Sequence, residues 1–162
     1  MDSIVIRPAT QEDASEFLRI ENENFSDPWT YAVFMETLNN PGYINLTAVL
    51  SVSASKTDQF AASDEIAGFI CLAVVADEGH IDNVSVAKTC RRLGVGERLL
   101  KEAMQRAKQR GACDFTLEVR TGNTAARALY EKAGFTCEGI RRNYYGHPTE
   151  DAAIYWKYAR DH

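Results

Sequence analysis

Two glycines one residue apart, within the segment RRLGVG at positions 91–96, constrain the fold of this chain more than any other feature. The residues before them carry apolar side chains at Ile81, Val84 and Val86, as a buried strand does. Residues 95–110, which begin between the two glycines, place their apolar side chains on one face of a helix. The sequence therefore predicts a strand that turns tightly into an amphipathic helix, a unit of folds that layer helices on a sheet.

The same turn is suited to bind an anion. Gly94 and Gly96 allow the backbone to approach a ligand closely, and the N-terminus of the following helix carries partial positive charge. A dinucleotide-binding turn needs a third glycine where this chain has Leu99, and a Walker loop needs lysine where it has Glu97. We therefore expect a different phosphate-bearing ligand, and a strand-to-helix turn without any ligand is the alternative at this point.

The pattern of apolar residues along the whole chain predicts a mixed α+β fold. Thr10 and Asp13 fit the two positions of a capping box at the start of a first helix. Residues 53–64 are polar and weakly patterned, which predicts a long hairpin loop. We expect about seven strands and about four helices in a single domain of residues 1–162. The expected strands cover residues 4–9, 43–52, 66–75, 79–87, 113–120, 135–140 and 152–158, and the expected helices follow Thr10 and cover residues 30–39, 95–110 and 123–133.

Charge and composition disfavour several classes of function. The net charge of −5 argues against general nucleic-acid binding and is compatible with a cationic substrate such as an amine or a basic peptide. The four cysteines and three histidines lack the spacing of a zinc site or a redox pair, so we expect no metal and only structural histidines. The N-terminal residues show no secretory signal and no apolar run is long enough for a membrane span, so a cytoplasmic protein is expected.

Two later segments carry candidate catalytic residues. In LEVR at positions 117–120, Glu118 and Arg120 share one face of an expected strand. A carboxylate in the middle of a strand either lies on a solvated face or belongs to a site, and taken alone Glu118 favours the solvated face. Tyr130 lies in the helical segment 123–135, where a packed core aromatic residue is the simplest interpretation if the residue stands alone.

Together, these motifs resemble those of the GNAT superfamily of N-acetyltransferases. The pattern Arg/Gln-x-x-Gly-x-Gly at 91–96 is similar to its acetyl-CoA pyrophosphate loop, and residues 123–135 are similar to its signature Asn-x-x-Ala-x-x-Leu-Tyr-x-x-x-Gly-Phe. LEVR at 117–120 and IRRNYY at 140–145 narrow the resemblance to the ribosomal-protein-alanine N-acetyltransferases of the RimI type. Nearer the N-terminus, the resemblance is carried by the turn FSDPW at 25–29.

That resemblance implies a fold, a reaction and a set of site residues. The fold would be a twisted mixed sheet flanked by helices, and the reaction would be attack of an N-terminal α-amine on the thioester of acetyl-CoA. Glu118 would act as general base and Tyr130 would protonate the leaving thiolate. The cofactor would contact Val84, Ser85, Val86, Arg91, Arg92, Leu93, Gly94, Val95, Gly96, Glu97 and Asn123, and the acceptor would contact Phe25, Trp29 and a loop with Tyr144 and Tyr145.

The acceptor implied by the resemblance is the N-terminal alanine of a ribosomal protein. A lysine side chain or a small-molecule amine is the alternative acceptor, and a non-catalytic acyl-CoA sensor is the alternative outside the enzymes. Two features depart from the family pattern. Glu97 occupies a position that is often basic, which could weaken cofactor affinity, and the 53–64 loop is longer than a minimal member needs.

Overall fold

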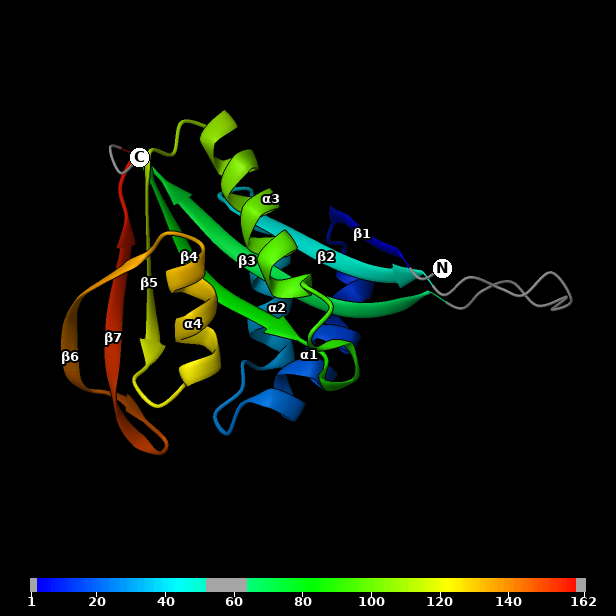
Figure 1. Cartoon of the computed structure of the whole chain (residues 1–162). Helices are drawn as coiled ribbons and strands as arrows, with labels where there is room; N and C mark the ends of the chain where they lie inside the picture. The colour runs from blue at the N-terminus through cyan, green and yellow to red at the C-terminus, as the bar shows by residue number, and fades with distance from the viewer. Residues whose placement is uncertain (1–2, 52–63, 160–162) are drawn as a thin grey trace, which may run out of the picture.

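The computed structural model describes residues 3–51 and 64–159, and its centre is a seven-stranded sheet with the order β1-β2-β3-β4-β5-β7-β6 (Figure 1). Residues 53–63 of the expected hairpin loop lie outside the described part of the chain. Only β4 and β5 pair in parallel within this sheet, so the expected mixed α+β class is confirmed. The strands are β1 (Ser3–Pro8), β2 (Tyr43–Ser51), β3 (Glu65–Val75), β4 (Glu78–Val86), β5 (Asp114–Arg120), β6 (Thr136–Gly146) and β7 (Thr149–Lys157), and the α-helices are α1 (Ala14–Asn24), α2 (Tyr31–Leu38), α3 (Val95–Gln109) and α4 (Thr124–Lys132).

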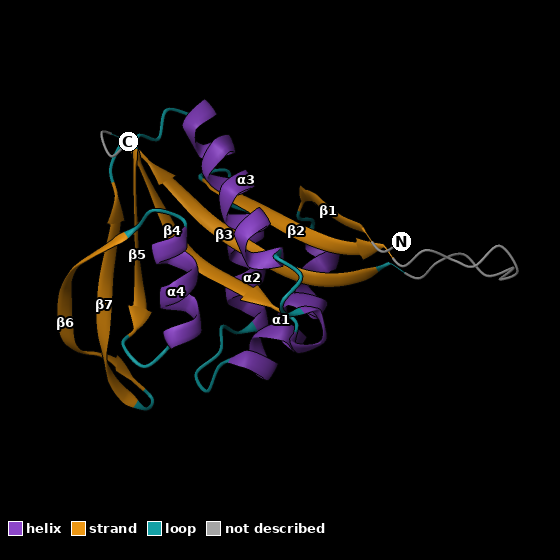
Figure 2. Cartoon of the chain, in the orientation of Figure 1, coloured by secondary structure: helices purple, strands orange, loops and turns teal. Residues whose placement is uncertain are grey.

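Helices cover both faces of the sheet. In Figures 1 and 2, α3 and α4 lie on one face, and α1 and α2 lie on the other. The apolar stripe of α3 buries Leu99, Leu100 and Ala103, and this helix packs over β2, β3 and β4. On the opposite face, the rings of Phe17 in α1 and Phe69 in β3 stack with centroids 4.4 Å apart. The described helices are all too short or too polar to cross a membrane.

β4 and β5 separate along their length, and this opens the sheet near its centre. Their parallel pairing involves only residues 78–80 of β4 and 114–116 of β5. Farther along, the register between β3 and β4 shifts between Cys71 and Leu72, which leaves Asp82 of β4 without a facing residue. Such a bulge bends a strand and redirects its backbone groups. β4 is therefore paired with β5 only at its beginning and carries an irregularity on its β3 side farther along.

β6 is longer than the sequence predicted. The expected strand at 135–140 extends through residue 146, because β6 resumes its pairing with β7 at Tyr145. An irregularity precedes this point, and within it Asn143 has a φ of 52°. Tyr144 and Tyr145 therefore lie in a strand, and the expectation of a loop at these two residues is wrong.

Candidate functional site

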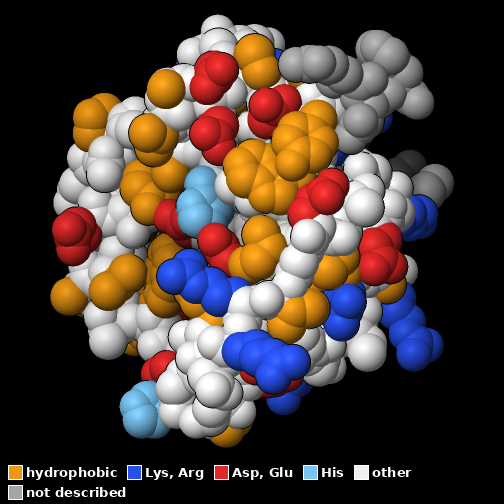
Figure 3. Space-filling view, turned by 90° about the vertical axis from the view of Figure 1, so that its left-hand side faces the viewer, with side chains coloured by type: hydrophobic (Ala, Val, Ile, Leu, Met, Phe, Trp, Pro, Cys, Tyr) orange, Lys and Arg blue, Asp and Glu red, His pale blue; other side chains and the backbone are white. Residues whose placement is uncertain are grey.

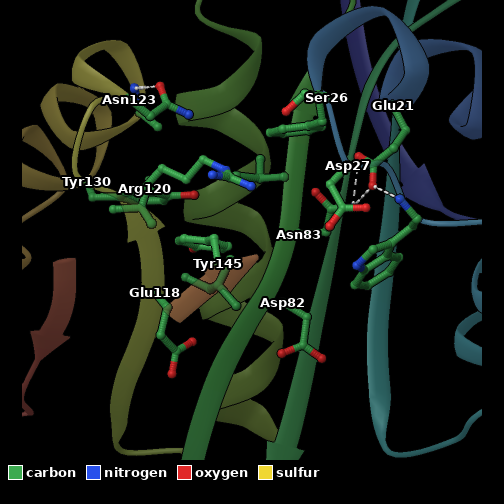
Figure 4. Close-up of a pocket in the computed structure, with 16 residues that line it drawn as sticks. Glu21, Ser26, Asp27, Asp82, Asn83, Glu118, Arg120, Asn123, Tyr130 and Tyr145 are labelled. Carbon is green, nitrogen blue, oxygen red and sulfur yellow. Dashed lines mark hydrogen bonds between the residues drawn. The ribbon is translucent and has the colours of Figure 1, made fainter. Parts of the chain in front are cut away.

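The opening between β4 and β5 holds a pocket of about 180 Å³. Its walls come from β4, β5, α4, β6 and the turn between α1 and α2. Figure 4 shows Glu118, Arg120 and Tyr130 on one side of the opening, and Glu21 and Asp27 on the other. The separation of the two strands thus brings together residues that lie far apart in the sequence. Glu118 belongs to this pocket rather than to a fully solvated face, since its side chain is only 22% exposed.

A chain of polar contacts runs beside the pocket from β5 to β2. Oε2 of Glu118 lies 2.6 Å from Nε2 of His80. Nδ1 of the same imidazole lies 3.6 Å from Oδ1 of Asp82, and the hydroxyl of Tyr43 donates to the other oxygen of Asp82. Figure 3 shows acidic side chains gathered around a histidine on one face of the molecule. The imidazole of His80 is therefore flanked by two carboxylates, which both favour its protonated form.

The contact between Glu118 and His80 shifts the proton affinity of both groups. Their hydrogen bond raises the pKa of His80 above its ordinary value and lowers the pKa of the Glu118 carboxyl. While His80 is protonated, Glu118 is consequently a weak base. Once His80 is neutral, the two side chains can take up one proton between them, and that proton belongs to the pair rather than to either residue. The pair is therefore suited to acid–base chemistry near neutral pH.

His80 is a candidate residue that the sequence did not single out. Its contact with the Glu118 side chain goes beyond the structural role expected for all histidines. His80 is the last residue of β4 that pairs with β5, where it faces Thr116, and Glu118 follows two residues later on the same face of β5. The sequence could have shown which side chains of each strand share a face. It could not have shown the register between β4 and β5, which places His80 beside Glu118.

Tyr130 serves both the core and the pocket. It is 5% exposed, and its ring packs against Phe135 and Tyr155 with centroids 5.9 and 6.2 Å away. The residue also lines the pocket. Burial raises the pKa of the Tyr130 phenol, so the side chain holds its proton at neutral pH and is available as a hydrogen-bond donor.

The turn between α1 and α2 forms the wall opposite α4 and β6. Phe25 and Trp29 line the pocket from this turn, and Tyr145 lines it from β6. Tyr144, which the resemblance also assigned to the acceptor, is not among the lining residues and is 44% exposed. Its ring instead packs edge-on against Tyr145, with centroids 5.0 Å apart. Of the four expected acceptor contacts, three therefore lie at the pocket and Tyr144 supports one of them from outside.

The expected phosphate-binding turn lies at the N-terminus of α3. Gly94 caps the helix with a φ of 76°, a conformation that favours glycine, and the space that a Cβ would occupy there is open. The N–H of Arg98 makes the first intrahelical bond, to the carbonyl of Gly94. The N–H groups of Val95, Gly96 and Glu97 therefore have no partner within the helix, and they are suited to bind phosphate oxygens.

The backbone of β4 faces the opening next to this turn. Ala87, the residue after β4, donates its N–H to the carbonyl of Ala67 in β3, and successive residues of a strand alternate the direction of their backbone groups. Val84 and Val86 therefore direct their N–H and C=O groups away from β3 and toward the side where β5 has separated. The carbonyl of Val86 already accepts a hydrogen bond from Asn24 at 2.9 Å, which confirms this direction. An open strand edge beside a phosphate-binding turn fits a cofactor with a pyrophosphate and an amide-bearing arm, such as acetyl-CoA.

Asn123 and Glu97, two of the expected cofactor contacts, also have partners within the protein. Oδ1 of Asn123 accepts the N–H of Ala126 at 3.1 Å and caps α4, and Asn123 lines the pocket as well. The carboxylate of Glu97 lies 3.4 Å from Nζ of Lys132, which offsets its negative charge beside the turn. Within the described residues, no three His, Cys, Asp or Glu side chains are placed to hold a metal ion.

Comparisons with known proteins agree with this architecture. The model of the acetyltransferase (GNAT) family matches residues 14–135. A ribosomal protein bS18-alanine N-acetyltransferase from Salmonella typhimurium is 36% identical, with 95% of each chain covered. The protein of that name from Haemophilus influenzae is 32% identical, with 86% of this chain and 88% of the relative covered. The crystal structure of the ribosomal-protein-S18-alanine N-acetyltransferase from Escherichia coli superimposes with a TM-score of 0.80, at 30% identity, covering 97% of this chain and 94% of that one.

Proposed function

The chain belongs to the acetyltransferase (GNAT) family, and we propose that it acetylates the N-terminal α-amine of a protein, with the alanine of ribosomal protein bS18 as its acceptor. The observation that carries this proposal is the similarity, over almost the whole chain, to proteins named for that reaction. The acidic pocket beside the open edge of β4 supports it, because a carboxylate-rich site suits an incoming ammonium group. The cytoplasm, where ribosomal proteins are made, is the compartment we propose.

In this proposal, the turn at the start of α3 and the open edge of β4 hold acetyl-CoA, which supplies the activated acetyl group. The free N–H groups of residues 95–97 bind the pyrophosphate, and Arg91 and Arg92 add positive charge beside it. The backbone groups of Val84 and Val86 bind the amide-bearing arm. Backbone N–H groups at the bulge also stabilise negative charge on the thioester oxygen.

We assign general-base catalysis to Glu118 together with His80. An N-terminal amine has a pKa of about 7.7–8.0, so much of it is protonated and unable to attack at neutral pH. While His80 is protonated, its hydrogen bond lowers the pKa of Glu118 and the carboxylate takes that proton poorly, whereas the pair takes it more readily once His80 is neutral. Asp82 then stabilises the protonated imidazole from its other side. Glu118 contacts the amine, directly or through a water molecule, and His80 acts through Glu118.

Tyr130 and the aromatic walls complete the assignment. We assign Tyr130 as the proton donor to the departing sulfur, because its phenol lines the pocket and retains its proton at neutral pH. Since burial also makes the phenol a weaker acid, it first donates a hydrogen bond to the sulfur, and the proton follows as the C–S bond breaks. Phe25, Trp29 and Tyr145 form the walls against which the first residues of the acceptor pack. The protein thereby orders the amine and the acetyl donor against each other, which is the main contribution that such a site makes to the rate.

The test is release of the CoA thiol with acetyl-CoA and a panel of acceptors. The panel contains peptides with the N-terminal residue Ala, Ser, Met or Gly, the same peptides blocked at the α-amine but carrying lysine, and small polyamines. We expect turnover with the free α-amines, fastest with alanine. Turnover confined to blocked lysine peptides or polyamines would replace the proposed acceptor. Binding of acetyl-CoA without turnover of any acceptor would favour a sensor.

A further inference from the structure

The last turn of α1 carries two side chains that reach across to β4. Glu21 accepts the backbone N–H of Trp29 at 2.9 Å and the side-chain amide of Asn83 at 3.0 Å from each carboxylate oxygen. Asn24 is the last residue of the same turn. Glu21 is 2% exposed, and burial raises the pKa of its carboxyl. The turn that forms the acceptor wall is thus anchored to the bulged region of β4 rather than only to its own helix.

Asn24 connects this turn to both parts of the cofactor site. Its Nδ2 donates to Oγ of Ser85 at 2.6 Å and to the carbonyl of Val86 at 2.9 Å. Its Oδ1 accepts a hydrogen bond from the guanidinium of Arg91 at 2.6 Å. Ser85 is only 5% exposed, so one end of this network is held in the interior. One carboxamide therefore bridges the open edge of β4 and the phosphate-binding turn.

Asn24 is also the last residue of α1, so its position sets where the acceptor turn begins. The next residue, Phe25, lines the pocket. A ligand that restricts the motion of Val86 and Arg91 also restricts Asn24 through the bonds described above. The acceptor turn then loses less freedom when a peptide binds to it, because part of the ordering cost has already been met.

We propose that Asn24 is a positioning residue that couples the two binding sites, so that CoA and the acceptor peptide strengthen each other's binding. The inference rests on the proposed function in two respects, that CoA occupies the turn before α3 with the open edge of β4, and that Phe25 contacts the acceptor. Coupling of this kind is reciprocal. CoA therefore raises the affinity for the peptide by the same factor by which the peptide raises the affinity for CoA. Loss of Asn24 leaves both sites present and disconnects them.

The experiment measures the dissociation constant of the acceptor with and without saturating CoA, which cannot transfer acetyl. The acceptor is whichever amine the wild-type protein acetylates in the panel above, so a wrong acceptor is detected there and does not decide this test. We expect the wild-type affinity to rise at least about fivefold with CoA, the lower end of typical coupling. Asn24→Ala should bring that ratio close to one while CoA alone still binds.

Two further variants separate coupling from a general loss of structure. Asn22→Ala removes an exposed asparagine from the same helix and should retain the wild-type ratio. Ser85→Ala removes one partner of Asn24 without altering α1 and should lower the ratio. A purely structural defect would weaken the binding of both ligands, but the ratio of acceptor dissociation constants with and without CoA would stay unchanged. An unchanged ratio in Asn24→Ala, or a wild-type ratio of one, would overturn the proposal.

Discussion

At the scale of single residues, the contact between Glu118 and His80 predicts how activity depends on pH. Below the raised pKa of His80, the imidazole is protonated and Glu118 has little affinity for a further proton. As the pH rises through that pKa, the pair becomes able to accept the proton of the amine, so kcat should increase. Because the hydrogen bond raises the pKa of His80, this increase should lie above the ordinary histidine value of about 6.5.

Substitution of either member should change this profile in a distinct way. Glu118→Gln removes the group to which we assign the contact with the amine, and it should lower kcat/KM by about 10²-fold or more at pH 7. The remaining activity should increase toward higher pH, where more amine is already neutral. His80→Gln should lower kcat/KM by a smaller factor, because the Glu118 carboxylate remains. His147→Gln changes an exposed histidine outside the pocket and serves as the control. If Glu118→Gln and His80→Gln both keep the wild-type dependence of activity on pH, the assignment of general-base catalysis to this pair is refuted.

These residues also mark how far the sequence could predict the site. Glu118 and Tyr130 stand in motifs that can be recognised along the chain, and both lie at the pocket. His80 stands in no motif, and its role depends on the register of two strands that are distant in sequence. Asn24 was missed for the same reason, since its partners lie on β4 and in the turn that follows it. Contacts that depend on tertiary register have no local signature.

At the scale of elements, Gly94 performs two tasks that substitution can separate. It caps α3 in a left-handed conformation, and it leaves open space beside the free N–H groups of the helix. Gly94→Ala should lower the free energy of unfolding by roughly 1–2 kcal/mol, the cost of the left-handed conformation for a residue with a Cβ. The added methyl group should also obstruct the phosphate-binding turn and weaken CoA binding.

Gly111 provides the matched control, because it follows the same helix, has a φ of 98° and also has open space beside it. Gly111→Ala should therefore cost similar stability without altering the affinity for CoA. Denaturant unfolding and CoA titration of both variants measure the two effects separately. If both variants bind CoA as the wild type does, the turn at Gly94 does not hold the cofactor.

Elements with strong patterning were also the ones best predicted. The helix expected at 95–110 is observed at Val95–Gln109, since its apolar stripe and its flanking glycines agree on the same limits. β6 was expected to end near residue 140, because RRNYYG offers little alternation of apolar and polar residues. Pairing with β7 carries the strand to residue 146 despite that sequence. Tertiary pairing thus extended a strand whose end the local pattern described poorly.

At the scale of the whole molecule, the distribution of charge predicts how salt affects the acceptor. The chain carries a net charge of −5, and the pocket is lined by Glu21, Asp27, Asp82 and Glu118 against one arginine, Arg120. Such a field attracts a cationic peptide and raises its rate of encounter. Salt weakens this attraction, since the screening length falls from about 10 Å at 0.1 M to about 3 Å at 1 M.

We therefore expect kcat/KM for an acceptor peptide with several basic residues after its N-terminal alanine to fall several-fold between 0.05 and 0.5 M NaCl. The decrease should come from a higher KM with little change in kcat. The screened interactions affect the encounter with the peptide rather than the proton transfer to Glu118 and His80. A peptide with the same N-terminus and neutral residues after it should change much less. Equal salt dependence for the two peptides would contradict this prediction. It would mean that the acidic pocket attracts only the terminal amine, and that the basic residues after it do not interact with the pocket.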